Sequence, residues 1–411
     1  MEGIHEKSRS GSEGPNLTHI LRLGIAGLGV ASTQILPPLA KLPLIKITAA
    51  ADTRADALAK FRQAYGGEGY STVEDLCRSA NVDAVYIATP NALHAEHAIA
   101  AAKNGKHIIV EKPMAMTLAE CDAMNEAAEK HCVKLLCGHT HSFDPPIRKI
   151  REIVRSGELG KLCMINTWNY NEFMYRPRMK HELAMSRGVV LNQGPHHVDI
   201  VRLIGGGLVR SVRAMTGIWD KGRGYEGSYT CYLEFVDGTP ATLVYSGYGF
   251  FDTAELFSWV GEGGQYRDPK TNLNVRQRLR EVRSPEEEEH LKEAMRFGGK
   301  REGEYSHVWS GGRKQPFFGF TLVSCEKGDI RQTPDGLCIY GETEQREIPL
   351  SAGSRGREAE VEELYNAVVH NRPVFHDGRW GAATLEVCLA MLESAEKRKE
   401  VFMSHQVPSP E

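Results

Sequence analysis

The sequence predicts an α/β domain with a parallel, doubly wound sheet, followed by an α+β domain with a large, mostly antiparallel open sheet. In the first third of the chain, short apolar runs alternate with stretches of helical periodicity, and the first run enters a glycine-rich turn. Beyond residue 160 the pattern changes to runs rich in β-branched and aromatic residues, separated by turn signals such as Asp237-Gly238.

The composition is that of a globular protein. With 411 residues, the chain is long enough for two or three domains. Its formal net charge of −3 argues against a polyanion-binding surface, so we expect no nucleic-acid partner. No apolar run approaches the ~18 residues that span a bilayer, so we expect no membrane role. Nine cysteines without paired zinc spacings favour a reducing, cytoplasmic location.

The chain divides into three expected segments. Residues 1–19 are polar and rich in Gly and Ser, which is typical of a flexible N-terminal arm. Residues 20–145 form the expected NAD-binding domain, and residues 146–411 an α+β domain for substrate binding and oligomerisation. Within it, residues 261–316 are a charged insertion, predicted to be mostly a solvated helix and loops, from which Tyr305, His307 and Trp309 could fold over a site. Two C-terminal helices are expected near 356–370 and 379–398.

A dinucleotide-binding fingerprint opens the ordered part of the chain. An apolar strand at residues 21–27 runs into Gly27-Leu28-Gly29-Val30-Ala31-Ser32, where glycine permits a tight turn and close approach of a pyrophosphate to a helix N-terminus. A second strand at residues 45–51 is followed by Asp52, where the fingerprint places an acid on the ribose 2′-hydroxyl. NAD is therefore favoured over NADP, although Arg54 could soften that preference.

Two further strands, at residues 84–88 and 107–110, lead into Thr89-Pro90-Asn91 and Glu111-Lys112-Pro113. Ligands of parallel sheets bind at the carboxyl ends of the strands, so these residues predict a Rossmann cofactor site with Lys112 beside the reactive ring as acid/base candidate. The expected cofactor-binding residues are Gly27, Gly29, Val30, Asp52, Thr53, Arg54, Thr89, Pro90, Asn91, His94, Glu111 and Lys112.

A second polar cluster precedes an apolar helix expected at residues 200–204. Asn192, Gln193, His196 and His197 concentrate donors and acceptors that a buried helix start would not tolerate without a ligand or partners. This segment is therefore predicted to form part of the site. The cluster Cys132, Cys137, His139 and His141 straddles a strand and its exit turn, so we expect no metal there.

These motifs resemble those of the Gfo/Idh/MocA oxidoreductases over roughly residues 21–250. The resemblance rests on the fingerprint, on Ala88-Thr89-Pro90-Asn91 with His94, on Glu111-Lys112-Pro113 and on residues 188–199. It implies an NAD-dependent dehydrogenase in which Lys112 and His196 flank the carbinol being oxidised. It also implies a homodimer or homotetramer built on the second-domain sheet, whose candidate interface residues are Tyr229, Tyr232 and Phe235.

Within that family, the chain resembles the phthalate 4,5-cis-dihydrodiol dehydrogenases most. The resemblance rests on Tyr175-Arg176-Pro177-Arg178, on residues 192–197, on Ser246-Gly247-Tyr248-Gly249 and on residues 324–331. Adjacent carboxylates on a substrate would fit Arg176 and Arg178, with Lys180, unless these form only a basic surface loop. The expected substrate-binding residues are His141, Tyr175, Arg176, Arg178, Asn192, Gln193 and His197.

The resemblance implies a small carboxylated dihydrodiol as substrate. Lys112 or His196 would take the hydroxyl proton, hydride would leave the same carbon, and the ring would then lose a proton and aromatise. Sugar and inositol members usually carry an aspartate where this chain has Asn192, which argues against a polyol. Two alternatives stay open: a dehydrogenase of a sugar, inositol or other hydroxylated ring, and a non-catalytic NAD(H)-binding regulator.

Overall fold

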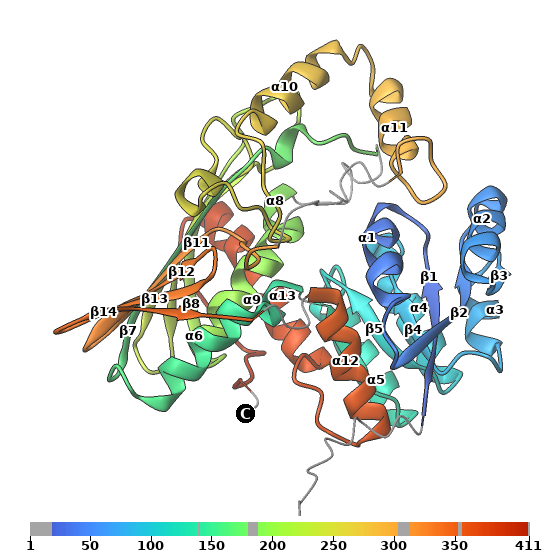
Figure 1. The fold of residues 1–411 in the computed structure, drawn as a ribbon, viewed down its shortest axis with the longest axis horizontal. Helices are drawn as coiled ribbons and strands as arrows, with labels where there is room; N and C mark the ends of the chain where they lie inside the picture. Colours follow the sequence, from blue (N-terminus) through green and yellow to red (C-terminus); the bar gives the residue numbers. More distant parts are fainter. Residues whose placement is uncertain (1–18, 139, 180–187, 303–312, 352–355, 410–411) are drawn as a thin grey trace, which may run out of the picture.

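The computed structural model describes residues 19–138, 140–179, 188–302, 313–351 and 356–409. They form two lobes, with the N-terminal lobe at the right of Figure 1 and a large open sheet at the left. Several predictions fall outside the described residues: the arm up to residue 18, His139, Lys180, Tyr305, His307 and Trp309.

The first lobe is built on a six-stranded sheet whose described strand pairs are all parallel, in the order β3-β2-β1-β4-β5-β6. Its strands are β1 (Leu21–Ala26), β2 (Ile45–Ala51), β3 (Glu68–Tyr70), β4 (Ala84–Ile87), β5 (His107–Glu111) and β6 (Leu135–Gly138). Its helices are α1 (Val30–Leu39), α2 (Ala55–Tyr65), α3 (Val73–Arg78), η1 (Asn91–Leu93), α4 (His94–Lys103) and α5 (Leu118–Lys130). This order confirms the predicted doubly wound sheet.

The second lobe is built on a nine-stranded sheet in the order β14-β13-β12-β11-β7-β10-β9-β8-β15. Its strands are β7 (Leu162–Tyr170), β8 (Val209–Gly217), β9 (Ser228–Phe235), β10 (Pro240–Ser246), β11 (Phe320–Cys325), β12 (Gly328–Thr333), β13 (Gly336–Gly341), β14 (Gln345–Pro349) and β15 (Val401–Phe402). β7 and β10 pair in parallel and the other described pairs are antiparallel, so the mostly antiparallel sheet is confirmed.

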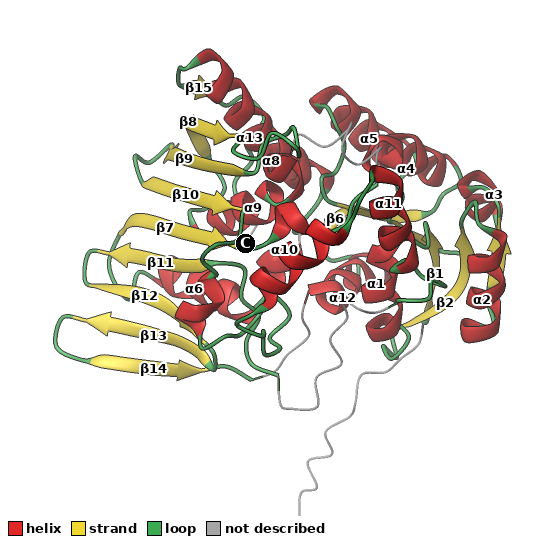
Figure 2. Ribbon diagram, turned by 90° about the horizontal axis from the view of Figure 1, so that it is seen from above, coloured by secondary structure: helices red, strands yellow, loops and turns green. Residues whose placement is uncertain are grey.

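The helices of the second lobe lie on the face of this sheet that looks toward the first lobe (Figures 1 and 2). They are η2 (Thr140–Phe143), α6 (Pro145–Ser156), η3 (Phe173–Tyr175), α8 (Gly188–Asn192), α9 (Gly194–Ile204) and α13 (Gly378–Lys397), whereas Leu256 of η4 (Thr253–Phe257) lines a groove with Trp168 of the opposite face. The outer face carries exposed apolar side chains such as Trp168, 40% exposed. Tyr232 belongs to that face, but Tyr229 and Phe235 are buried against the helices because side chains alternate along β9, so the prediction for these two was wrong.

The polar segment at residues 188–199 is helical, whereas the helix was expected to begin only at residue 200. α9 begins at Gly194 with a proline in its first turn, where a missing N–H is tolerated. His196 and His197 therefore lie inside the helix, about 100° apart around its axis, and point in different directions.

The chain returns to the first lobe near its end, which departs from the expected division at residue 145. α12 (Gly356–Val369) packs against that lobe, and its Val361, Leu364 and Tyr365 join the buried cluster that contains Leu21 and Phe61. The N–H of Cys137 in β6 also donates to the carbonyl oxygen of His376. The first lobe is therefore completed by residues more than 200 positions away in the sequence.

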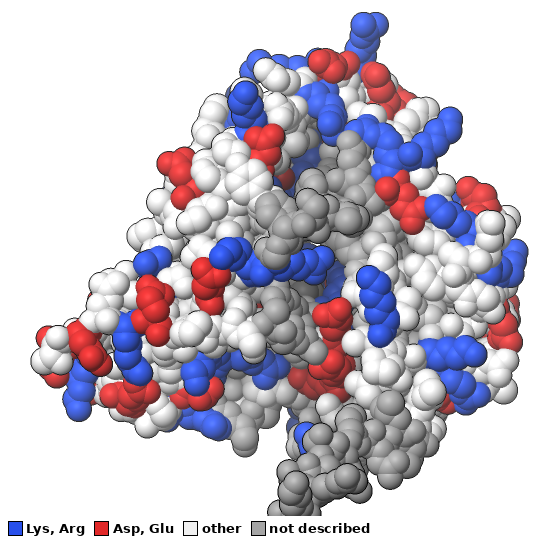
Figure 3. Space-filling model, in the orientation of Figure 1, with Lys and Arg blue, Asp and Glu red and all other residues white. Residues whose placement is uncertain are grey.

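The insertion forms an arch above the two lobes (Figure 1). Its helices α10 (Thr271–Glu281) and α11 (Pro285–Ala294) follow each other, and α11 lies over the first lobe. Charged side chains of both signs are intermingled over the face of the molecule shown in Figure 3. No helix among the described residues is long and apolar enough to cross a membrane.

We expect Leu364→Ala to lower the free energy of unfolding by about 2–5 kcal/mol, because the side chain is fully buried where α12 meets the first lobe. Urea unfolding of the purified protein measures the change. Leu273→Ala, at a site on α10 that is 55% exposed, is the matched control and should have little effect. Equal losses in the two variants would contradict the packing of α12 described above.

Candidate active site

The glycine-rich loop after β1 has the geometry that a pyrophosphate requires. Gly27 adopts a φ of +94°, and a Cβ there would lie 2.7 Å from the carbonyl oxygen of Ala88. A Cβ on Gly29, at the start of α1, would meet open space. Ser32, in place of the third glycine, is buried and donates its hydroxyl to the Gly27 carbonyl oxygen at 2.6 Å. The loop, with Val30 opening α1, therefore leaves room for a phosphate at a helix N-terminus and fits NAD.

Asp52 follows β2 and lies next to this loop. Its carboxylate accepts the N–H of Leu28 at 2.8 Å and the N–H of Arg54 at 2.8 Å. The Arg54 guanidinium bonds Asp52 at 3.2 Å and the Leu28 carbonyl oxygen at 2.6 Å, while Thr53 is exposed. Arg54 is therefore held against the loop by neighbours that a ribose phosphate would have to displace.

The insertion reaches this same loop through Phe297, which the sequence did not reveal. Phe297 donates its N–H to the Gly29 carbonyl oxygen at 3.3 Å, and its own carbonyl oxygen accepts from Arg54 at 3.3 Å. Its ring is 3% exposed and lies near Tyr65, with the Lys60 ammonium over it. The prediction of a mostly solvated insertion was therefore wrong at this end.

Thr89, Pro90 and Asn91 lie where predicted, directly after β4. Thr89 bonds the His97 ring at 2.9 Å through its hydroxyl. His94 is fully buried, and its two ring nitrogens lie 3.0 Å from the carbonyl oxygens of Thr89 and Pro113. It joins the loop after β4 to the loop after β5, so its place is behind the cofactor site and its contribution there is to position the two loops.

Lys112 joins the two lobes. Its ammonium group, at the carboxyl end of β5, donates to the backbone carbonyl oxygen of Asn192 in α8 at 2.7 Å. Burial lowers the pKa of Lys112 to about 8, with Glu111 opposing the shift and Arg357 adding to it. A lysine with this pKa carries a substantial neutral fraction near neutral pH and can accept a proton.

A buried charge cluster lies behind Lys112. Glu111 forms an ion pair with Arg357 of α12, and the Tyr86 hydroxyl lies 2.8 Å from Glu360 and 3.1 Å from Glu111. Despite the opposing effect of burial, the carboxylates raise the pKa of Arg357, so its charge is fixed. Glu111 is therefore paired with Arg357 of α12, which neutralises the negative charge next to Lys112.

His196 lies in the first turn of α9, four residues after Asn192, whose carbonyl oxygen accepts from Lys112. Its ring is 4.9 Å from that of His141, and both rings pack on Phe318. His141 is held in turn by Asp144, with 2.9 Å between Nδ1 and the carboxylate. Two imidazoles, one of them oriented by a carboxylate, therefore pack against the same phenylalanine ring, which the sequence did not reveal.

His197 does not belong to this site, so its assignment to the substrate was wrong. It is fully buried between Tyr229, 2.9 Å from Nδ1, and Thr167, 2.8 Å from Nε2. Burial lowers the pKa of His197 to about 3, so the ring is neutral. His196 faces the site, and because successive residues of a helix are about 100° apart around its axis, His197 faces the sheet.

The two arginines after η3 bind partners within the protein, so they do not form the expected pair of anion-binding side chains. The Arg178 guanidinium, in a residue only 7% exposed, lies between the rings of Phe173 and Tyr225 and donates to the Phe173 carbonyl oxygen. Arg176 donates to Glu172 at 2.8 Å and lies 3.9 Å from Glu262. The charge of Arg176 contributes to lowering the pKa of Lys112, after burial and Arg357.

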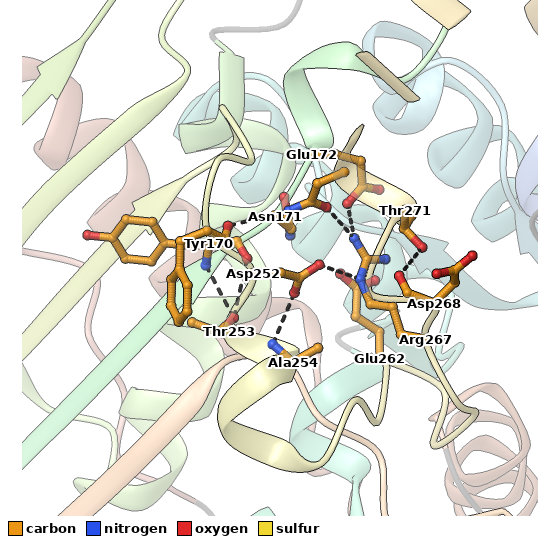
Figure 4. A network of polar contacts seen from close by, with 12 residues as sticks. Tyr170, Asn171, Glu172, Asp252, Thr253, Ala254, Glu262, Arg267, Asp268 and Thr271 are labelled. Carbon is orange, nitrogen blue, oxygen red and sulfur yellow. Dashed lines mark hydrogen bonds and ion pairs between the residues drawn. The ribbon is translucent and has the colours of Figure 1, made fainter. Parts of the chain in front are cut away.

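Glu172 is the centre of a network that fastens the insertion to β7 (Figure 4). Arg267 binds Glu172 and also donates to Asp252 at 2.6 Å and Asn272 at 2.9 Å. Although burial opposes it, Arg176 and Arg267 lower the pKa of Glu172 to about 2. The segment that carries Tyr175 is thus tied to Arg267 of the insertion and, through it, to Asp252.

Asn192 ends α8 and Gln193 precedes α9, and the Gln193 amide donates to the Asn192 side chain at 2.8 Å. The described residues contain no group of three or more His, Cys, Asp or Glu side chains that could hold a metal ion.

The comparisons agree with this geometry. A model described as an oxidoreductase family with an NAD-binding Rossmann fold, Gfo/Idh/MocA, matches residues 21–139, and the model of that family's C-terminal domain matches residues 147–267. A 1-carboxy-3-chloro-3,4-dihydroxycyclohexa-1,5-diene dehydrogenase from Comamonas testosteroni is 35% identical over 385 residues, 92% of this chain and 95% of the relative.

Two solved structures show the same fold. A protein from Bordetella bronchiseptica RB50, described as a dehydrogenase, is 38% identical, with a TM-score of 0.87 over 94% of this chain and 100% of that one. An oxidoreductase from Agrobacterium radiobacter in complex with NAD⁺, L-tartaric acid and magnesium is 16% identical, with a TM-score of 0.70 over 93% of this chain and 98% of that one.

Fold and site together define an NAD-dependent oxidoreductase, which confirms the predicted enzyme class and cofactor. The chain belongs to the Gfo/Idh/MocA family, as its motifs indicated.

We expect kcat/KM to rise with pH and to level off above an apparent pKa at or below about 8, because only the neutral amine of Lys112 accepts a proton. Initial rates of NADH formation from about pH 6 to about pH 10 measure this profile. Lys112→Arg keeps a charge that is not lost in proteins, so it should lower the rate at least about 100-fold at every pH. An unchanged profile in Lys112→Arg would exclude Lys112 as the base.

We expect Phe297→Ala to release the insertion from the glycine-rich loop. Loss of a buried phenylalanine costs about 3 kcal/mol, which corresponds to roughly 100-fold more of the undocked form. Tryptic cleavage at the exposed Arg280 and Arg283 should accelerate, and NADH should bind more weakly. Phe402→Ala, at a site that is 61% exposed, is the control and should leave both unchanged. Equal cleavage rates would show that the contact does not hold the insertion.

Proposed function

We propose that this protein oxidises a carboxylated aromatic cis-dihydrodiol with NAD, and that its substrate is phthalate cis-4,5-dihydrodiol, which yields 4,5-dihydroxyphthalate. The observation that carries this proposal is the Comamonas testosteroni relative, which spans nearly the whole chain and is named for a carboxylated dihydroxycyclohexadiene. The lowered pKa of Lys112 and the paired imidazoles of His141 and His196 supply the proton acceptors that such a reaction requires.

In this proposal, Lys112 is the base that takes the hydroxyl proton. Its amine lies at the end of β5, on the side of the cofactor loops, and burial keeps part of it neutral. NAD, held by the glycine-rich loop and Asp52, would supply the acceptor for the hydride of the same carbon. His196, beside His141 and Asp144, is proposed to take the proton that the neighbouring ring carbon loses as the ring aromatises. The ammonium of Lys112 would return its proton to the carbonyl oxygen in that step, so both oxygens of the product carry a proton and one proton is released overall.

The remaining predicted residues divide by their surroundings. Gly27, Gly29, Asp52 and Thr89 are proposed to contact the cofactor, because they line the carboxyl ends of β1, β2 and β4. Asn192, Gln193, His141 and Tyr175 are proposed to face the substrate. The carboxylate of Asp52 would repel a 2′-phosphate, and Arg54 is held by Asp52 and two carbonyl oxygens, so NAD is preferred over NADP.

We also propose a cytoplasmic homodimer or homotetramer. All nine cysteines are free, as expected in a reducing compartment. The uncovered face of the second sheet presents Met164, Trp168 and Tyr232, each about two-fifths exposed, next to a groove that Phe251 and Leu256 help to line. A contiguous apolar face of this kind is typical of a subunit interface.

The test is NADH formation by the purified protein with NAD and phthalate cis-4,5-dihydrodiol, compared with myo-inositol, glucose and Lys112→Ala. We expect turnover of the dihydrodiol alone and a loss of at least about 100-fold in the variant, because Lys112 acts on the transferred proton. Turnover of a polyol instead would replace the substrate, as the alternative within the family predicts. Stoichiometric NADH binding without turnover of any of these compounds would indicate a regulator.

A further inference from the structure

Arg276 on α10 has an unusual environment. Its guanidinium lies between two aromatic rings, with its central carbon 4.4 Å from the centre of Tyr175 and 3.7 Å from that of Phe250. Its Nε and Nη2 atoms are shielded from solvent and have no hydrogen-bond partner among the described residues. These two atoms form the edge of the guanidinium that binds a carboxylate through two parallel hydrogen bonds. Hydrogen-bond donors that are shielded from water and have no acceptor destabilise the protein, so an anion is the expected partner of this edge.

The neighbouring arginines differ from Arg276 in this respect. Arg176 binds Glu172, Arg223 binds Glu288 at 2.7 Å, and Arg267 binds Glu172 and Asp252. Arg276 has no carboxylate within ion-pair distance in the described parts of the chain, although Asp220 is near enough to favour its charge. Burial lowers the pKa of Arg276, but an arginine stays charged at neutral pH.

The position of Arg276 links it to the candidate active site. Tyr175, on which it stacks, precedes Arg176, and the charge of Arg176 acts on Lys112. The preceding residue of η3, Met174, and Val189 of α8 both adjoin Gly247, and α8 is the helix whose Asn192 carbonyl oxygen accepts from Lys112.

The other ring belongs to a loop pressed against the same segment. Gly249, next to Phe250, adopts a φ of +54°, and a Cβ there would lie 2.8 Å from the Cα of Glu172. Phe250 is 86% exposed, so its ring can turn aside at little cost in buried area and open the guanidinium edge to a ligand. The Ser246-Gly247-Tyr248-Gly249 motif thus holds Phe250 over Arg276.

We propose that Arg276, supplied by the insertion, binds a ring carboxylate of the substrate and makes the enzyme selective for carboxylated dihydrodiols. This inference rests on the proposed function and deepens it. In the Tyr175-Arg176-Pro177-Arg178 motif, Arg176 binds Glu172 and Arg178 stacks on aromatic rings. The Nε and Nη2 atoms of Arg276, by contrast, have no hydrogen-bond partner among the described residues. That edge is shielded from solvent, and a charged hydrogen bond is stronger where water is excluded.

The experiment compares Arg276→Gln with Arg280→Gln, an exposed arginine one turn further along α10. For phthalate cis-4,5-dihydrodiol, Arg276→Gln should raise KM by about 10- to 100-fold with little change in kcat, since a hydrogen bond to a charged group contributes that much. For the uncarboxylated cis-dihydrodiol of benzene, both variants should match the unaltered enzyme. Arg276→Lys, which keeps charge but not the two-pronged edge, should recover only part of the loss.

A second readout separates this inference from the proposed function. Calorimetric titration of phthalate into the NADH-loaded protein should show binding to the unaltered enzyme and Arg280→Gln, and at least about 10-fold weaker binding to Arg276→Gln. That result supports the inference even if the dihydrodiol is not turned over. The inference is overturned if Arg276→Gln binds phthalate as tightly as Arg280→Gln, if no variant binds phthalate, or if Arg276→Gln loses activity equally on both dihydrodiols.

Discussion

The desolvation of one lysine is the constraint on which the rest of the molecule depends. Lys112 is held at the junction of the lobes by the Asn192 carbonyl oxygen, and its neighbour Glu111 is neutralised by Arg357. If that carboxylate were unpaired, it would raise the pKa of Lys112, and the amine would stay protonated near neutral pH. β5 supplies the amine, α8 its acceptor and α12 the balancing charge. The arrangement of three distant segments thus keeps one amine buried, with a lowered pKa.

Much of the cofactor side could be predicted because local patterns determine it. A glycine-rich turn, an acid after the second strand and polar residues after the fourth and fifth are set by where parallel strands end. The elements that were missed lack such patterns. β3 is three residues with a central glycine, and β14 is a polar edge strand, Gln345–Pro349, whose side chains are mostly exposed. Neither strand has the alternation of apolar and polar residues from which a strand is predicted.

The substrate side was harder to predict because side-chain direction and pairing decide it. A helix start misplaced by six residues gave His197 the same role as His196, although one faces the sheet. The arginines of a motif looked like anion ligands, but Glu172 and two aromatic rings already occupy them. Arg276 and Phe297 come from an insertion, and Tyr175 and Arg54, which they contact, are far from them in the sequence, so only the folded chain brings these residues together.

The docking of α12 on the first lobe has a consequence for synthesis of the chain on the ribosome. The first lobe is made early, yet its Glu111 has no counter-ion and its buried cluster no Leu364 until the last tenth or so of the chain emerges. A nascent chain that has completed its nucleotide-binding strands must therefore wait, with part of its apolar surface uncovered, for the C-terminus. Such a protein matures as one unit, because its cofactor domain begins first but is completed only when α12 emerges near the end of the chain.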